Sequence, residues 1–192
     1  MIMWLRRKKV LVFLCLFVTS VVAETESKIY PKLTLESGAA YLGLFDVKTN
    51  TEAFLGIPFA VPPVGSLRWS PPKPFVESNE IITAQSFAPA CMQGLHIFNW
   101  YKNVAEGFSS DPKVIKNPYS SEDCLYLNIW RPSVTKEGEK LPAIIYIHGG
   151  SNKGGWSFEP NYIGDNLAKH GVVVITIAYR LGVFGYFSHP DL

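Results

Sequence analysis

Residues 141–155 read LPAIIYIHGGSNKGG, and the rest of the chain is organised around this stretch. Its first part, Ala143–Ile147, is a short apolar run rich in β-branched residues, which predicts a strand buried on both faces within a parallel sheet. The run ends at His148-Gly149-Gly150, where two glycines permit backbone angles and close approaches that a Cβ would forbid. A glycine turn after a buried strand presents backbone N–H groups to a ligand at the carboxyl edge of an α/β sheet. A plain tight turn is the alternative when these three residues are taken alone.

The sequence after this turn predicts one more strand and a helix before it. Residues 172–179, VVVITIAY, form a second apolar run that predicts another buried strand. Between the two runs, Asn161 is a suitable N-cap and Gly171 a suitable C′ residue for a helix over 161–170. Strand, helix and strand in this order predict a βαβ unit with two parallel strands.

The sequence before the turn favours short strands and long connections. Residues 123–132 alternate apolar and polar positions and predict a strand, and residues 29–35, 39–47 and 51–55 predict short antiparallel strands. Residues 56–75 contain six prolines and several aromatic residues, which predict an extended strap laid over the domain. Residues 76–123 are mixed in character and predict a long irregular segment.

The length and composition are those of one globular domain behind an export signal. The 192 residues are 47% hydrophobic and 18% charged, which suffices to bury a core. Four consecutive basic residues from Arg6 precede the apolar run 10–18, and Val21 and Ala23 occupy the −3 and −1 positions of a cleavage site. Residues 1–23 therefore predict a signal peptide and a secreted or periplasmic protein, with an uncleaved anchor as the alternative.

Cleavage of this segment would change both the charge and the cysteine count. The chain would keep 14 basic and 16 acidic residues, a net charge of −2, which offers no electrostatic footprint for nucleic acid. Cys15 would leave, and Cys91 and Cys124 would remain. Two cysteines in an exported protein suggest one disulfide, while two free buried thiols are the alternative.

Four blocks of the sequence resemble the type B carboxylesterases, a family that includes the cholinesterases. Residues 121–132, SEDCLYLNIWRP, resemble its EDCLYLN motif, and residues 56–69, GIPFAVPPVGSLRW, resemble its GIPFA segment. Residues 146–150, YIHGG, and 179–186, YRLGVFGY, resemble two further blocks in the same order. The resemblance implies an α/β-hydrolase fold that is incomplete here, with antiparallel N-terminal strands and the first βαβ part of a mostly parallel sheet. It implies that residues 24–192 are the N-terminal part of the domain.

The resemblance also implies roles for individual residues. The backbone N–H groups of Gly150 and Ser151 match the donors that bind the oxyanion of an attacked ester, with Ser151 in place of a third glycine. Cys91 and Cys124 match a disulfide that closes a surface loop. Arg68 and Glu122 match a buried ion pair that links the proline-rich strap to the EDCLYLN strand.

The sequence contains no member of a catalytic triad at a matching position. No G-x-S-x-G pentapeptide occurs, and His96, His170 and His189 match no catalytic histidine. In the family all three triad residues lie beyond the position of Leu192. The resemblance therefore implies a serine hydrolase for small-molecule esters, without metal or cofactor and without a membrane segment after signal cleavage, of which this chain is a piece. A catalytically inactive binding or adhesion protein and a truncated gene prediction are the alternatives.

Overall fold

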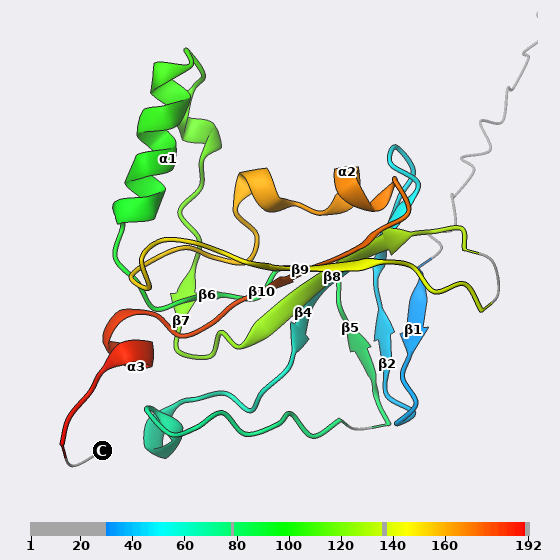
Figure 1. Cartoon of the computed structure of the whole chain (residues 1–192), viewed down its shortest axis with the longest axis horizontal. Helices are drawn as coiled ribbons and strands as arrows, with labels where there is room; N and C mark the ends of the chain where they lie inside the picture. The colour runs from blue at the N-terminus through cyan, green and yellow to red at the C-terminus, as the bar shows by residue number, and fades with distance from the viewer. Residues whose placement is uncertain (1–29, 78, 136–137, 191–192) are drawn as a thin grey trace, which may run out of the picture.

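The computed structural model describes residues 30–77, 79–135 and 138–190, so the signal segment predicted at 1–23 lies outside the described residues. A five-stranded sheet forms the centre of the structure, in the order β3-β4-β8-β10-β9 (Figure 1). No helix among the described residues has the length and apolarity needed to cross a membrane. The strands of this sheet are β3 (Leu44–Asp46), β4 (Thr51–Pro58), β8 (Tyr126–Pro132), β9 (Ala143–Ile147) and β10 (Val173–Ile177).

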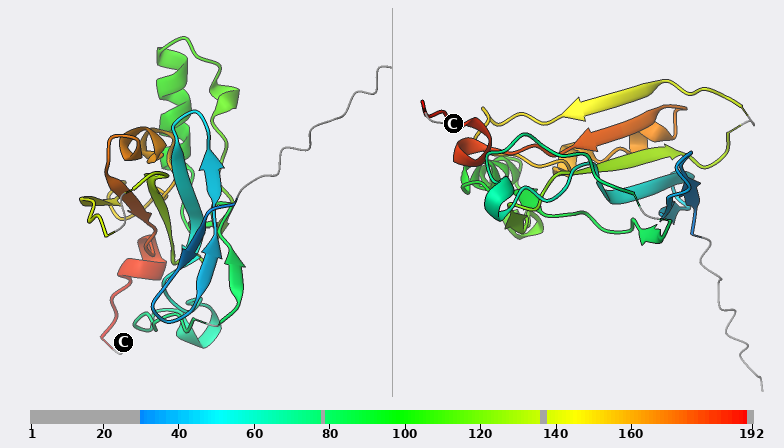
Figure 2. Two further views of the ribbon diagram at one scale, coloured as in Figure 1. Left: turned by 90° about the vertical axis from the view of Figure 1, so that its right-hand side faces the viewer. Right: turned by 90° about the horizontal axis from the view of Figure 1, so that it is seen from below.

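The predicted βαβ unit is confirmed at one side of this sheet. β9 and β10 pair in parallel, with Val174 opposite Ile144, and β8 pairs antiparallel with the other side of β10. Figure 2 shows β9 as the outermost strand, next to β10. The connection between the two strands carries the short helix α2 (Asp165–Ala168), which lies over the sheet (Figure 1).

The prediction of a strand buried on both faces is wrong for β9. Ile144, Ile145 and Ile147 are 45%, 63% and 61% exposed. Within the described residues β9 has a neighbour on one side only, so its other edge and much of its surface face solvent. Apolar side chains on an unpaired edge strand favour association with other chains. In β10, which lies between two strands, Val174 and Thr176 are buried.

The helix predicted over 161–170 is much shorter in the structure. A single 3-10 turn, η3 (Pro160–Tyr162), precedes the four residues of α2. The chain bends at Gly164, which packs so closely on β8 that a Cβ there would lie 2.7 Å from the Trp130 ring. The helix also ends earlier than predicted, at Ala168 with Lys169 as its C-cap, and Gly171 lies in the turn that follows. Gly171 has a φ of 87°, and its N–H donates to the Ala168 carbonyl.

The antiparallel strands near the N-terminus belong to two sheets. The strand expected over 39–47 divides at Gly43, where a Cβ would lie 2.4 Å from the Ala53 carbonyl oxygen. The part after Gly43 is β3 of the central sheet, and the part before it joins a separate three-stranded sheet. That sheet has the order β1-β2-β5, formed by β1 (Lys32–Thr34), β2 (Ala40–Leu42) and β5 (Ile81–Thr83).

The proline-rich strap folds back on itself instead of running in one direction. β4 continues to Pro58, and then Ala60 forms an antiparallel bridge with Pro74 around the 3-10 turn η1 (Gly65–Leu67). An aromatic residue does anchor it, as predicted. The Trp69 indole N–H donates to the Val183 carbonyl of the short helix α3 (Gly182–Tyr186) at 2.9 Å.

The segment 76–123 contains a helix that the sequence analysis did not predict. α1 (His96–Gly107) projects away from the sheet in Figure 1 and is followed by the 3-10 turn η2 (Pro112–Val114). No side chain caps its first turn, because Leu95 occupies the N-cap position. The helical spacing of Ile97, Tyr101 and Val104 was the available signal.

The two ends of this segment are tied together. β6 (Ala90–Cys91) pairs in parallel with β7 (Ser120–Ser121), and a disulfide joins Cys91 to Cys124 beside this pair. Both sulfur atoms belong to residues that are almost fully buried, in a core cluster with Leu125 and Leu181.

We expect this disulfide to stabilise the protein substantially. Closing a loop of 33 residues reduces the entropy of the unfolded chain, which is worth about 3–4 kcal/mol in the chain-entropy model. Replacing both cysteines by serine should therefore lower the free energy of unfolding by about this amount. Denaturant unfolding of the double variant checks the size, and non-reducing peptide mapping checks the bond. Two freely alkylated thiols in the wild-type protein would contradict the prediction.

The polar side chain of Asn128 is buried in the middle of the central sheet. The Asn128 Oδ1 of β8 accepts the Gly56 N–H at 3.0 Å, and its Nδ2 donates to Ser157 Oγ at 3.1 Å and Thr176 Oγ1 at 3.0 Å. Both ends of the amide are thus hydrogen-bonded, which burial of such a group requires. The three partners come from β4, from the segment that follows the glycine turn and from β10.

Candidate functional site

The turn that follows β9 has an unusual backbone. The φ of Gly150 is 108°, and those of Ser151 and Asn152 are 55° and 60°. The Lys153 N–H donates to the Gly150 carbonyl at 3.0 Å, which closes a tight turn with two left-handed central residues, the φ pattern of type I′. Ser151, the residue in place of a third glycine, therefore adopts a conformation that glycine takes more readily.

A pair of substitutions at Ser151 should show this strain. Alanine removes the hydroxyl and keeps the Cβ, whereas glycine removes both. We expect Ser151→Gly to be more stable than Ser151→Ala by about 1 kcal/mol, because only glycine relieves the left-handed conformation. At a position with ordinary φ the order is reversed, since glycine costs about 0.5–1 kcal/mol relative to alanine. Thermal or denaturant unfolding measures the order, and a more stable alanine variant would contradict the prediction.

The turn belongs to a loop, residues 148–155, whose two ends pack against each other. A Cβ on Gly150 would lie 1.9 Å from the Gly154 carbonyl oxygen, and a Cβ on Gly155 would lie 2.3 Å from Nδ1 of His148. Neither distance leaves room for a side chain. We call residues 148–155 the glycine loop. Its close packing makes its shape depend on glycine at both ends.

The glycine loop borders a hollow of ligand size. Within the described residues, neither the Gly150 N–H nor the Ser151 N–H donates a hydrogen bond to another group. The loop faces an open hollow of about 470 Å³, in the size range of small-molecule sites. The hollow is lined by Ile147, His148, Gly149, Ser151, Asn152, Ile177, Tyr179 and Tyr186.

His148, the first residue of the glycine loop, is held in place by several contacts. It is buried, its ring stacks on Tyr179 with centroids 4.3 Å apart, and the Tyr179 hydroxyl donates to the His148 carbonyl at 2.6 Å. Nδ1 lies 2.9 Å from the Gly149 carbonyl oxygen, which can only accept, so the contact places the proton on Nδ1. Burial lowers the pKa of His148, which keeps the ring neutral at pH 7. These contacts give His148 a structural role in the turn.

A buried carboxylate joins the residue that follows the glycine loop to α1. Glu159 accepts the Trp156 N–H at 3.0 Å and the Tyr101 hydroxyl at 2.6 Å. Burial, together with the hydrogen bond to Glu159, raises the pKa of Tyr101, so this phenol remains a neutral donor. Neither residue was singled out from the sequence, because no motif marks a contact between residues this far apart.

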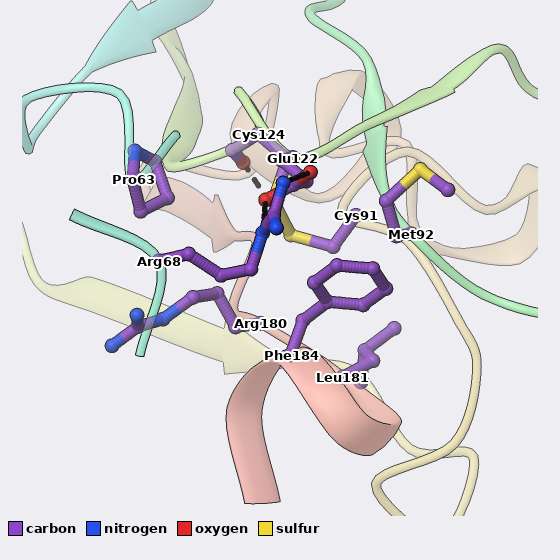
Figure 3. Close-up of a pocket in the computed structure, with 9 residues that line it drawn as sticks. All are labelled: Pro63, Arg68, Cys91, Met92, Glu122, Cys124, Arg180, Leu181 and Phe184. Carbon is purple, nitrogen blue, oxygen red and sulfur yellow. Dashed lines mark hydrogen bonds and ion pairs between the residues drawn. A yellow bond between two sulfur atoms is a disulfide. The ribbon is translucent and has the colours of Figure 1, made fainter. Parts of the chain in front are cut away.

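Figure 3 shows that Arg68 and Glu122 face each other beside the disulfide. Two hydrogen bonds of 2.5 and 2.6 Å join them, and the side chains are 39% and 22% exposed. The predicted pair is thus present, but the expectation that it is buried is wrong, since both side chains are partly exposed where they line a cavity of about 10 Å³. The Arg68 guanidinium lowers the pKa of Glu122, so the pair stabilises the fold above the unfolded-state pKa and loses this effect as pH falls through the folded-state pKa.

The described residues contain no assembled catalytic triad. His96 packs at the start of α1, where a Cβ added to Gly154 would meet its ring at 2.5 Å, and His170 is exposed after α2. His189 stacks on Phe187, with ring centroids 6.2 Å apart. Within the part of the chain that the structure describes, no three His, Cys, Asp or Glu side chains are placed to hold a metal ion.

Comparison with known proteins decides the family. The profile of the carboxylesterase family matches residues 40–191, most of the chain. The chain belongs to the carboxylesterase family. It is 40% identical to fumonisin B1 esterase of Sphingopyxis macrogoltabida over 174 residues, which are 90% of this chain and 28% of that relative. It is also 40% identical to carboxylesterase 1C of Mus musculus, over 79% of this chain and 26% of that relative.

Solved structures of this family share the fold. A thermophilic pNB esterase matches 85% of this chain and 30% of its own length, with 29% identity and a TM-score of 0.70. A carboxylesterase of Geobacillus stearothermophilus matches 81% of this chain and 27% of its own length, with 34% identity and a TM-score of 0.61. These matches confirm the predicted α/β-hydrolase fold. The chain spans less than a third of the length of these relatives and neighbours.

Proposed function

We propose that residues 24–192 are the N-terminal part of a carboxylic ester hydrolase that acts through an acyl-serine intermediate. In such a reaction a serine attacks the ester carbonyl, a histidine takes up its proton, and the oxyanion that forms is held by backbone donors. This chain would supply those donors, the N–H groups of Gly150 and Ser151. The serine, the histidine and the acidic residue would come from sequence after Leu192. The substrate class is a small-molecule carboxylic ester, and neither a metal nor a cofactor takes part.

The backbone of the glycine loop is the observation that carries this proposal. The adjacent N–H groups of Gly150 and Ser151 have no partners among the described residues, and Ser151 lines a hollow large enough for a small ester. Preorganised N–H donors of this kind are worth about 100- to 1,000-fold each in turnover, because they cost no reorganisation during the reaction. The strained φ of Ser151 is consistent with a backbone that is shaped for binding.

The exposed strand β9 supports the idea that more sheet packs here in the complete protein. Its isoleucine side chains are exposed on an edge without a neighbour among the described residues. A strand on that edge would cover them and would continue a sheet of which β9 and β10 are the first parallel pair. For the cell compartment we propose export, on the basis of the sequence of residues 1–23.

A serine-directed label tests the proposal in the complete protein. We expect burst hydrolysis of a p-nitrophenyl ester and stoichiometric labelling by a phosphonate probe, with the label on a serine outside residues 24–192. Peptide mapping locates the label. A well-folded complete protein without hydrolysis or labelling would overturn the proposal and favour the inactive binding protein. A label on Ser151 would overturn the assignment of the nucleophile.

A further inference from the structure

Gln93 holds the last glycine of the glycine loop at both of its backbone polar groups. The Gly155 N–H donates to Oε1 of Gln93 at 2.7 Å, and Nε2 of Gln93 donates to the Gly155 carbonyl at 2.8 Å. Nε2 also donates to the Cys91 carbonyl at 3.2 Å. The amide oxygen therefore accepts one hydrogen bond, and the NH₂ group donates two, which uses both of its hydrogens.

These contacts fix the position of a residue against which the rest of the loop packs. Gly155 lies against the His148 ring and the Gly149 carbonyl, and the adjacent Gly154 lies against Gly150. A displacement of Gly155 would remove the support on which Gly150 rests. Gln93 itself lies two residues after Cys91, whose position the disulfide to Cys124 restrains.

We infer that Gln93 is a positioning residue for the glycine loop: its amide fixes Gly155 and thereby the N–H groups of Gly150 and Ser151. The inference rests on the proposed function insofar as these groups bind an oxyanion. Gln93 touches neither substrate nor reacting atoms and acts through the backbone alone. Displacement of a catalytic donor by about 1 Å can cost about 100-fold in rate.

Two variants of the complete protein test the inference. Gln93→Met keeps the length of the side chain and removes all of its hydrogen bonds. Gln93→Glu keeps an acceptor for the Gly155 N–H but places a second oxygen opposite the Gly155 carbonyl, where two acceptors repel. Gln85→Met is the matched control, because Gln85 is also half-buried and donates to a glycine carbonyl, that of Gly43 at 3.1 Å, away from the loop.

The first measurement is hydrogen exchange and does not depend on activity. We expect the Gly155 amide to exchange at least about tenfold faster in Gln93→Met, because it loses its partner, and to be less affected in Gln93→Glu, which keeps an acceptor. In Gln85→Met the exchange of this amide should stay at the wild-type rate. Unchanged exchange at Gly155 in Gln93→Met would overturn the inference, whatever the proteins hydrolyse.

The second measurement separates positioning from general stability. In Gln93→Met we expect kcat to fall about 10- to 100-fold with KM nearly unchanged, since the lost interaction acts in the transition state. Affinity for a trifluoromethyl ketone, whose serine adduct carries an oxyanion, should fall by a similar factor. Faster exchange at Gly155 with kcat and ketone affinity no lower than in Gln85→Met would overturn the positioning role while the proposed function stands. A wild-type protein that hydrolyses no ester would overturn the proposed function and the catalytic part of the inference together.

Discussion

Replacing Gly150 by alanine is expected to lower the kcat for ester hydrolysis of the complete protein by about 100-fold or more, the usual cost of losing one oxyanion donor. A Cβ at this position would lie 1.9 Å from the Gly154 carbonyl oxygen, and the φ of 108° disfavours any side chain. The backbone must therefore shift at the residue whose N–H is proposed to bind the oxyanion. Steady-state kinetics on the purified, folded variant measures the loss.

Gly171→Ala is the control for this substitution. Gly171 also has a positive φ, 87°, but an added Cβ would meet nothing within 4 Å. The control therefore carries a similar backbone strain, of about 1–2 kcal/mol, at a site away from the glycine loop. We expect it to lower thermal stability and to leave kcat unchanged. If Gly150→Ala folded and hydrolysed ester at the wild-type rate, the oxyanion donors would lie elsewhere.

The second large effect is the absence of covalent turnover in residues 24–192 expressed alone. Hydrolysis through an acyl-serine needs a nucleophile, a base and an acid, and none of the three has a candidate at a matching position here. Donors without a nucleophile leave at most a weak rate above that in water. We expect no burst with a p-nitrophenyl ester and no stoichiometric labelling by the phosphonate probe, with the complete protein measured in parallel as the positive control.

The same preparation should associate in solution. The exposed isoleucines of β9 form an apolar edge that can pair with other chains. Light scattering during purification measures this tendency, and Ile145→Lys, which places a charge on the strand, should reduce it. Burst kinetics with a labelled serine in this preparation would contradict the expected inactivity.

The elements that the sequence could predict are those whose signal is local. The alternation in residues 123–132 gave β8, and the apolar runs on either side of 148–171 gave β9 and β10 in their parallel arrangement. A glycine turn after β9 was also predictable, because two glycines directly after an apolar run permit backbone angles that a Cβ disfavours. α1 was missed because it starts without a capping side chain inside a segment rich in loop-forming residues, although its apolar spacing is helical.

Other features depend on contacts that no local pattern contains. The exposure of β9 follows from its place in the strand order, which an apolar run cannot encode. The contacts of Gln93 with Gly155 join residues 62 positions apart. The Arg68–Glu122 pair was anticipated through the family resemblance, but its partial exposure depends on the shape of the surrounding surface.

The contacts of Asn128 have a consequence for how the strands find their partners. A slip of β8 by one residue would put Leu127 or Ile129 where the amide now lies and would turn the amide toward the opposite face. Three separate segments would then lose a hydrogen bond in one step, at sequence distances of 72, 29 and 48 residues. Misregistered pairings would thus be less stable than the observed one, because a buried amide without partners is costly. The Asn128 side chain therefore favours a single register of β8 in the central sheet.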